Sequence, residues 1–210
     1  MKIQILTDRS SWFFNNQDKT PIRFKKYLKN LISDHRHIKS NYDLTFIISY
    51  YKIIPKKFLF YSKHNLVIHE SDLPKGRGMS PLYWQILKGV KKVVFTIFEC
   101  SQNMDEGNYY FKKNFYFKPT LLFEEIKKKQ LKHAFDMIYI FLKMYKKKGK
   151  VKSYSQKGKP TYFPKILPSF SEINIDKSIK SQINKIRTRD NKSYPAYFFY
   201  KKRKYIIKIT

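Results

Sequence analysis

Cysteine is nearly absent from this chain of 210 residues, in which Cys100 is the single example. One cysteine cannot form a disulfide within the chain, so we expect a protein of a reducing compartment. The apolar run from Met1 to Leu6 is too short for a secretory signal peptide. Together these observations predict a cytoplasmic protein.

Long hydrophobic runs are also missing. The longest apolar region lies between Met137 and Met144, where Asp136 borders it and Lys143 interrupts it. A membrane-spanning helix needs about 20 predominantly apolar residues. We therefore expect no membrane span.

Three common catalytic or cofactor motifs are lacking. No Gly-x-Gly-x-x-Gly follows the first apolar run, which argues against dinucleotide binding. His35 and His37 have no further His or Cys at ligand spacing, so we expect a solvated loop there and no metal. Ser71 has no nucleophile-elbow context, which argues against a serine hydrolase.

Acidic residues are scarce, with 15 Asp and Glu against 45 Lys and Arg, and the formal net charge is +30. The lysines are spread along the whole chain and accompany many Ile, Asn, Tyr and Phe residues, as an AT-rich coding sequence would produce. We therefore expect a solvated basic surface rather than a dedicated nucleic-acid face, although nucleic-acid binding stays open. Such a surface attracts anionic substrates of any kind.

The apolar residues are plentiful and their spacing predicts an α/β fold. Hydrophobic residues make up 42% of the chain and aromatic residues 18%, which is enough for a globular core. Short apolar runs predict buried strands of a parallel sheet, and apolar residues at helical spacing predict helices between them. The expected strands are Lys2–Leu6, Leu44–Ser49, Leu66–His69 and Val93–Glu99, and the expected helices are Pro21–Ser33, Pro81–Lys88 and a long one from Thr120 to Lys148.

The composition changes after Gly149, which ends the long helix. Ser, Gly and Lys dominate Lys150–Lys159, as is typical of a flexible connection. Beyond it we expect a helix over Asp176–Arg187 and two strands, Tyr197–Tyr200 and Tyr205–Ile209. The sequence thus predicts a domain over residues 1–148, a linker over 149–160, and a small C-terminal α+β region over 161–210.

The residues best placed for chemistry follow two of the predicted strands. His69 ends one strand and precedes an irregular loop that contains Pro74, Gly76 and Gly78. The next strand is followed by a tight turn that presents Asp105. Because ligands of open α/β sheets bind at the carboxyl ends of strands, His69 and Asp105 are candidate catalytic residues.

A longer pattern surrounds these two residues. It runs His69-x-Ser71-x-Leu73-Pro74-x-x-Arg77-Gly78-x-x-Pro81-x-x-Trp84-x-Ile86-x-x-Gly89, then Thr96 and Met104-Asp105-x-Gly107. This pattern resembles the catalytic core of the 10-formyltetrahydrofolate-dependent formyltransferases, which include methionyl-tRNA formyltransferases and sugar N-formyltransferases. The segments Phe163–Asp176, Ile183–Arg187 and Tyr194–Phe198 are similar to the C-terminal region of the sugar-modifying members.

The resemblance implies a fold, a reaction and a site. It implies a Rossmann-like open, mainly parallel sheet with flanking helices, with residues 1–148 as the catalytic domain. It implies transfer of a formyl group from a folate cosubstrate to an amine, with His69 and Asp105 as catalytic residues. The folate-binding residues implied are Leu73, Pro74, Arg77 and Gly78. A homodimer is compatible with the family.

One position departs from the family pattern. The family places an asparagine two residues before the catalytic histidine, where its amide stabilises the oxyanion, and this chain has Val67 there. Loss of one oxyanion donor typically costs ~10²–10³ in rate. Asn103 and Ser71 are the candidate replacements, and Asn103 is preferred because its side chain is also an amide.

The resemblance leaves the acceptor open. The C-terminal similarity favours a nucleotide-linked amino sugar. The alternative acceptor is methionyl-tRNA, which the charge of +30 would suit. A third interpretation, which Val67 raises, is a catalytically impaired homologue that still binds folate or a nucleotide sugar.

Overall fold

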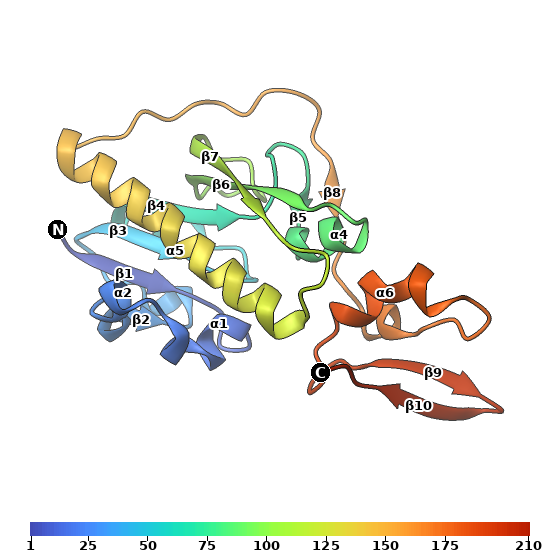
Figure 1. Ribbon diagram of the computed structural model, residues 1–210. Coiled ribbons are helices and arrows are strands. Elements are labelled where there is room, and N and C mark those ends of the chain that lie inside the picture. The colour runs from blue at the N-terminus through green and yellow to red at the C-terminus, as the bar shows by residue number, and fades with distance from the viewer.

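A six-stranded sheet lies at the centre of the computed structural model, which describes residues 1–210 (Figure 1). Its strand order is β2-β1-β3-β4-β6-β7. Strands β2, β1, β3 and β4 run parallel, whereas β6 runs antiparallel to both of its neighbours, β4 and β7. The strands are β1 (Ile3–Leu6), β2 (Leu31–Ile32), β3 (Tyr42–Ile47), β4 (Ser62–His69), β6 (Lys92–Glu99) and β7 (Tyr109–Tyr116). This arrangement confirms the predicted α/β class with an open, mainly parallel sheet.

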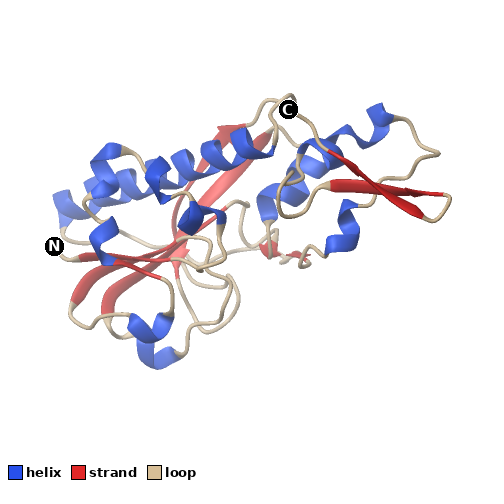
Figure 2. Ribbon diagram, turned by 90° about the horizontal axis from the view of Figure 1, so that it is seen from below, coloured by secondary structure: helices blue, strands red, loops and turns tan.

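Helices flank the sheet, as the view from below also shows (Figure 2). They are α1 (Trp12–Asn15), α2 (Ile22–Lys25), α3 (Lys56–Leu59), α4 (Pro81–Leu87) and α5 (Phe123–Lys148), and 3₁₀ turns occupy Gln17–Lys19, Leu28–Asn30 and His35–His37. Helix α5 is by far the longest. Gly149 ends it in the left-handed conformation, at φ 67°, as predicted.

The long helix α5 covers one face of the sheet, and the main core lies between them. Leu131, Phe135 and Ile138 of α5 pack in this core against alternate residues of the strands, among them Leu66 and Ile68 of β4. The intervening Val67 packs in a second, smaller cluster with Leu6, Ile38, Ile47, Ile54 and Phe58. Because residues two apart on a strand share a face, His69 lies on the same face as Val67, away from α5.

His133 of α5 is buried in the main core among phenylalanines. Its ring stacks on Phe115 with centroids 3.9 Å apart, and neither ring nitrogen has a hydrogen-bond partner. Burial lowers the pKa of His133 from 6.5 to about 4 although the nearby Asp136 opposes the shift. The folded protein therefore keeps His133 neutral, whereas the unfolded chain protonates it below about pH 6.5.

We accordingly expect stability to depend on pH through His133. The contribution of neutral His133 to the free energy of unfolding is complete above about pH 6.5. It is lost as the pH falls toward about 4, and the loss amounts to about 3 kcal/mol. His133→Phe keeps an aromatic ring in the stack and should flatten this part of the curve. Denaturant unfolding between pH 4 and 7 measures the effect, with exposed His37→Ala as the control. A parallel curve for His133→Phe and the natural protein would refute the assignment.

One predicted helix is wrong, and one long strand of the main sheet was not predicted. The segment Pro21–Ser33 forms α2, a 3₁₀ turn and β2 instead of one helix, because Leu31 and Ile32 pair with β1 at the edge of the sheet. Strand β7 was not predicted, because Lys112 and Lys113 interrupt its alternation of apolar residues. Pairing along β6 stabilises it nonetheless.

The C-terminal unit lies beside the sheet and contains α6 (Ile179–Arg187), β9 (Ala196–Tyr200) and β10 (Arg203–Ile207), preceded by a 3₁₀ turn at Pro168–Ser171 (Figures 1 and 2). Strands β9 and β10 form an antiparallel hairpin, as predicted. Arg187 attaches the unit to the start of α5 by donating a hydrogen bond from Nη1 to the Leu121 carbonyl, at 2.7 Å. None of the helices is both long and apolar enough to cross a membrane.

The connection after α5 is anchored rather than free, so the prediction of a flexible segment is wrong at its centre. Tyr154 exchanges two backbone hydrogen bonds with Tyr109, of 2.9 and 2.8 Å. Farther along, β8 (Tyr162–Phe163) runs parallel to β5 (Arg77–Gly78) as a two-stranded sheet. The division into domains at 148 and 161 stays a prediction.

Candidate functional site

His69 ends β4 and lies in a buried site, where 8% of its side chain is exposed. Its Nε2 lies 2.8 Å from the Gly76 carbonyl oxygen. A carbonyl can only accept, so Nε2 carries the proton and donates it to Gly76. The ring also packs edge-on against Phe98 of the neighbouring strand. Nδ1 makes no hydrogen bond and holds the lone pair, so it is the ring atom that can accept a proton.

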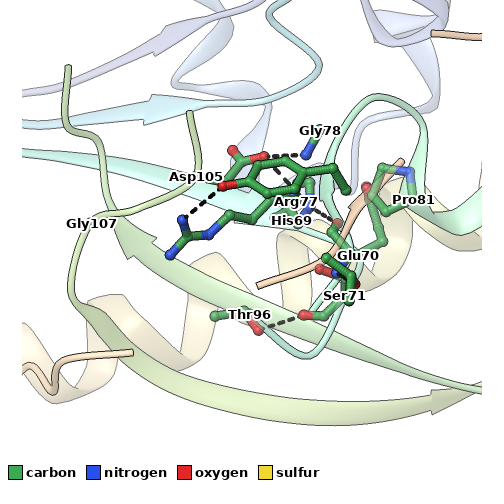
Figure 3. A network of polar contacts seen from close by, with 12 residues as sticks. His69, Glu70, Ser71, Arg77, Gly78, Pro81, Thr96, Asp105 and Gly107 are labelled. Carbon is green, nitrogen blue, oxygen red and sulfur yellow. Dashed lines mark hydrogen bonds and ion pairs between the residues drawn. The ribbon is translucent and has the colours of Figure 1, made fainter. Parts of the chain in front are cut away.

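Asp105 lies in the loop between β6 and β7 and points at the same place (Figure 3). Its Oδ2 accepts a hydrogen bond from the Gly78 amide at 2.8 Å and lies 3.7 Å from His69 Nε2. The residue adopts a left-handed backbone conformation, at φ 54°, which Asp tolerates better than most residues. The structure therefore brings together the two residues that the sequence selected.

Two glycines allow the loops to approach this closely. A Cβ on Gly107 would lie 1.6 Å from the Glu99 carbonyl oxygen, so only glycine fits behind the Asp105 turn. A Cβ on Gly78 would lie 2.4 Å from the Phe163 carbonyl oxygen, and Gly78 has φ +99°. Both positions belong to the pattern identified in the sequence.

The other candidate residues have partners within the protein. Arg77 is 7% exposed, and its Nη1 pairs with Glu106 Oε1 at 2.7 Å. Asn103 donates from Nδ2 to the other oxygen of Glu106, at 2.8 Å. Leu73 and Pro74 are buried and joined by a cis peptide bond, and their carbonyls accept hydrogen bonds from Lys112 Nζ at 2.5 Å and from the Thr161 amide at 3.4 Å.

Val67 occupies an apolar environment beside this site. It lies half-buried in the smaller cluster together with Tyr50 and Cys100, which are also half-buried. Burial raises the pKa of the Cys100 thiol to about 12, so the thiol is neutral at physiological pH. Val67 supplies no hydrogen-bond donor at the position of the family's asparagine, and the Tyr50 hydroxyl pairs with His35 Nδ1 at 2.7 Å.

Ser71 has a hydroxyl that is fully buried and without a hydrogen-bond partner. Its backbone carbonyl accepts a hydrogen bond from Thr96 Oγ1 at 2.6 Å, which fixes the start of the loop after β4 (Figure 3). A buried hydroxyl cannot reach a substrate in this conformation. The geometry therefore disfavours Ser71 as the replacement donor.

Sequence reasoning missed three residues that build the site. Glu106 bonds to both Arg77 and Asn103, and Thr161 Oγ1 accepts a hydrogen bond from the Gly76 amide at 2.8 Å. Gln156 Oε1 accepts from Arg77 Nη2 at 2.9 Å. Glu106 follows Asp105 directly and could have been suspected, whereas Gln156 and Thr161 lie about 50 residues farther along the chain and carry no local signal.

Comparison with known proteins gives one family and several related structures. The family described as Formyl transferase matches residues 23–140. The methionyl-tRNA formyltransferase of Thermotoga neapolitana is 29% identical over 154 residues, which are 72% of this chain and 49% of that protein. This chain thus spans about half the length of the curated relatives it matches.

Two solved structures cover nearly the whole chain. The methionyl-tRNA formyltransferase from Clostridium thermocellum superposes with a TM-score of 0.78 at 26% identity, over 97% of this chain and 90% of that one. A sugar N-formyltransferase from Shewanella superposes with a TM-score of 0.68 at 18% identity, over 100% and 97% of the two chains. At that lower identity the likeness concerns the fold.

Proposed function

Because the chain belongs to the formyl transferase family, we propose that it transfers a formyl group from 10-formyltetrahydrofolate to the amino group of a nucleotide-linked amino sugar. The observation that carries the reaction is the convergence of His69 and Asp105, 3.7 Å apart, at the end of β4. The proposed catalytic residues are His69 and Asp105; Asn103 would join them only by leaving Glu106, to which its amide donates at 2.8 Å. The chain matches 49% of the Thermotoga neapolitana relative, so that relative supports the formyl transfer proposed for the matched residues and nothing that depends on the rest of its length.

The surroundings of His69 fit a folate. Val67, Tyr50 and Cys100 form a half-buried apolar surface on the His69 side of the sheet, which suits a flat ring system. Leu73, Pro74, Arg77 and Gly78 form the adjoining loop, and we propose that it contacts the folate mainly through its backbone. When bound, the folate supplies the formyl group to the acceptor amine.

The protein's own groups then handle the proton. The attacking amine must be neutral, and it loses a proton as its bond to the formyl carbon forms. His69 Nδ1 holds a lone pair and can accept that proton, and Asp105 lies close enough to stabilise the charged ring. The proton can return to the folate nitrogen that leaves, so no other co-reactant is needed.

The choice of a nucleotide sugar as acceptor rests on the C-terminal unit. A sugar N-formyltransferase structure covers 100% of the chain, and the methionyl-tRNA formyltransferase structure from Clostridium thermocellum covers 97%, so the support comes from the sequence similarity of residues 163–198 to the sugar-modifying members. Methionyl-tRNA is the second candidate. It is favoured by the sequence relatives, which are methionyl-tRNA formyltransferases, and by the net charge of +30.

A turnover assay separates these proposals. Purified protein is given 10-formyltetrahydrofolate with a panel of nucleotide-linked amino sugars or with methionyl-tRNA, and release of tetrahydrofolate is followed. We expect turnover with at least one amino sugar. Turnover with methionyl-tRNA alone would establish the second candidate. Folate binding without turnover on any acceptor would identify an impaired homologue.

Val67→Asn restores a donor at the position where the family places one. Because the Ser71 hydroxyl is buried and the Asn103 amide bonds to Glu106, we expect turnover to rise by about tenfold or more. Val67→Leu adds no donor and is the control. The same turnover in Val67→Asn and the natural protein, with a large loss in Asn103→Ala, would instead give the role to Asn103.

A further inference from the structure

The anchored connection after α5 crosses the candidate site as a strap, defined here as residues Tyr154–Phe163. One end is fixed to the beginning of β7 by the two backbone bonds between Tyr154 and Tyr109. The other end pairs with β5, where Phe163 lies beside Gly78. Between these anchors, Gln156 and Thr161 make hydrogen bonds to the loop after β4, and Gln156 also bonds to the Asp105 turn.

Gln156 is the strap residue that reaches the Asp105 turn. Its Nε2 donates hydrogen bonds to the Asp105 carbonyl at 2.7 Å and to the Gly107 carbonyl at 2.9 Å. Its Oε1 accepts a hydrogen bond from Arg77 Nη2 at 2.9 Å. Both donor hydrogens are used, so the half-buried amide has a single orientation that satisfies all three partners.

These bonds join the two loops of the site. Arg77 belongs to the loop whose Gly76 carbonyl holds His69 and whose Gly78 amide holds Asp105. Asp105 is a non-glycine residue at φ 54°, a conformation that surrounding contacts must maintain. Without Gln156, two carbonyls of the turn would lose their donor and Arg77 would keep Glu106 as its main partner.

We propose that Gln156 is a positioning residue, which fixes the Asp105 carboxylate against His69 by clamping the turn Asp105–Gly107 to Arg77. The proposal rests on the proposed function for its effect on rate, but the clamp itself does not depend on that function. The proposal also assigns a part in the site to the strap, which lies between α5 and the C-terminal unit.

Gln156→Met tests the clamp, because methionine is similar in length and makes none of the three bonds. We expect kcat for formyl transfer to fall about 10- to 100-fold while KM for the folate changes less than about threefold. Gln156→Glu keeps the acceptor for Arg77 but turns an oxygen toward the two carbonyls, so it should be as defective as Gln156→Met. This second variant separates the bond to Arg77 from the bonds to the turn.

Gln182 provides a matched control. It is also a half-buried glutamine, donates to the Asn174 and Lys177 carbonyls, and accepts from the Asn174 amide, but it lies in the C-terminal unit. Gln182→Met should cost similar thermal stability and leave kcat unchanged. If kcat falls in both Gln156→Met and Gln182→Met in proportion to their loss of Tm, the positioning role is overturned.

Amide hydrogen exchange tests the clamp without any activity. The Gly78 amide is bonded to Asp105 Oδ2, and the adjacent Met79 amide is bonded to the Phe163 carbonyl at 3.1 Å. In Gln156→Met we expect exchange of the Gly78 amide to accelerate about tenfold or more while Met79 stays protected. If the natural protein shows no turnover and Gln156→Met still accelerates exchange of the Gly78 amide, the proposed function is refuted and the clamp is kept. Unchanged exchange at Gly78 would refute the clamp.

Discussion

His69→Ala is expected to abolish formyl transfer, with a loss of at least about 10³-fold in kcat. The substitution removes the group that we propose accepts the proton of the amine. It also removes the hydrogen bond to the Gly76 carbonyl, which alanine cannot replace. The measurement is release of tetrahydrofolate under saturating substrates, with circular dichroism and thermal unfolding to verify the fold.

The control for this variant is His64→Ala. His64 lies on the same strand, β4, but at its other end, where its Nδ1 lies 3.2 Å from Glu99 Oε2. We expect His64→Ala to keep most of the activity. Because alanine leaves a small cavity at the buried position 69, His69→Asn is a second variant that fills more of the space. Substantial activity in a folded His69 variant would disprove the assignment of the site.

Asp105→Asn is expected to lower turnover by about 10²- to 10⁴-fold with little effect on folate affinity. Asparagine tolerates the left-handed conformation at φ 54° and can still accept the Gly78 hydrogen bond, so it removes the charge and preserves the turn. In the proposed mechanism the carboxylate stabilises the protonated ring that His69 forms when it accepts the proton of the amine. The loss should therefore appear in kcat, measured beside a folate-binding titration.

Asp72→Asn is the control for this variant. Asp72 lies on the loop after β4 and pairs with Lys112 at 2.6 Å, but its side chain is 56% exposed. Its loss should change kcat by less than about twofold, because an exposed ion pair contributes little. If Asp105→Asn instead weakened folate binding and turnover equally, Asp105 would be a residue that only maintains the turn.

The strap connects the catalytic loops with the C-terminal unit. Beyond β8, Trp84 of α4 donates from Nε1 to the Pro164 carbonyl at 2.9 Å and stacks on Phe163. Arg189 of the C-terminal unit lies over the Tyr83 ring at 4.5 Å, and burial lowers its pKa to about 10. These contacts attach the C-terminal unit to α4 and α4 to the end of the strap.

The sequence by itself determined the elements whose signals are local. Apolar runs predicted the buried strands β3 and β4, and the cap at Gly149 predicted the end of α5. The spacing from His69 to Gly78 and the Asp105–Gly107 turn were enough to select the pair that the structure places 3.7 Å apart. These features depend on residues near one another in the chain, where periodicity and turn chemistry apply.

The tertiary structure alone decided the features that depend on distant residues. Leu31 and Ile32 form a strand because β1 offers an edge, and β7 forms despite its lysines because β6 pairs with it. Val67 proved to lie in an apolar cluster, which the family pattern at its position did not predict. Gln156 reaches Asp105 across 51 positions of sequence, and only folding brings such groups within hydrogen-bonding distance.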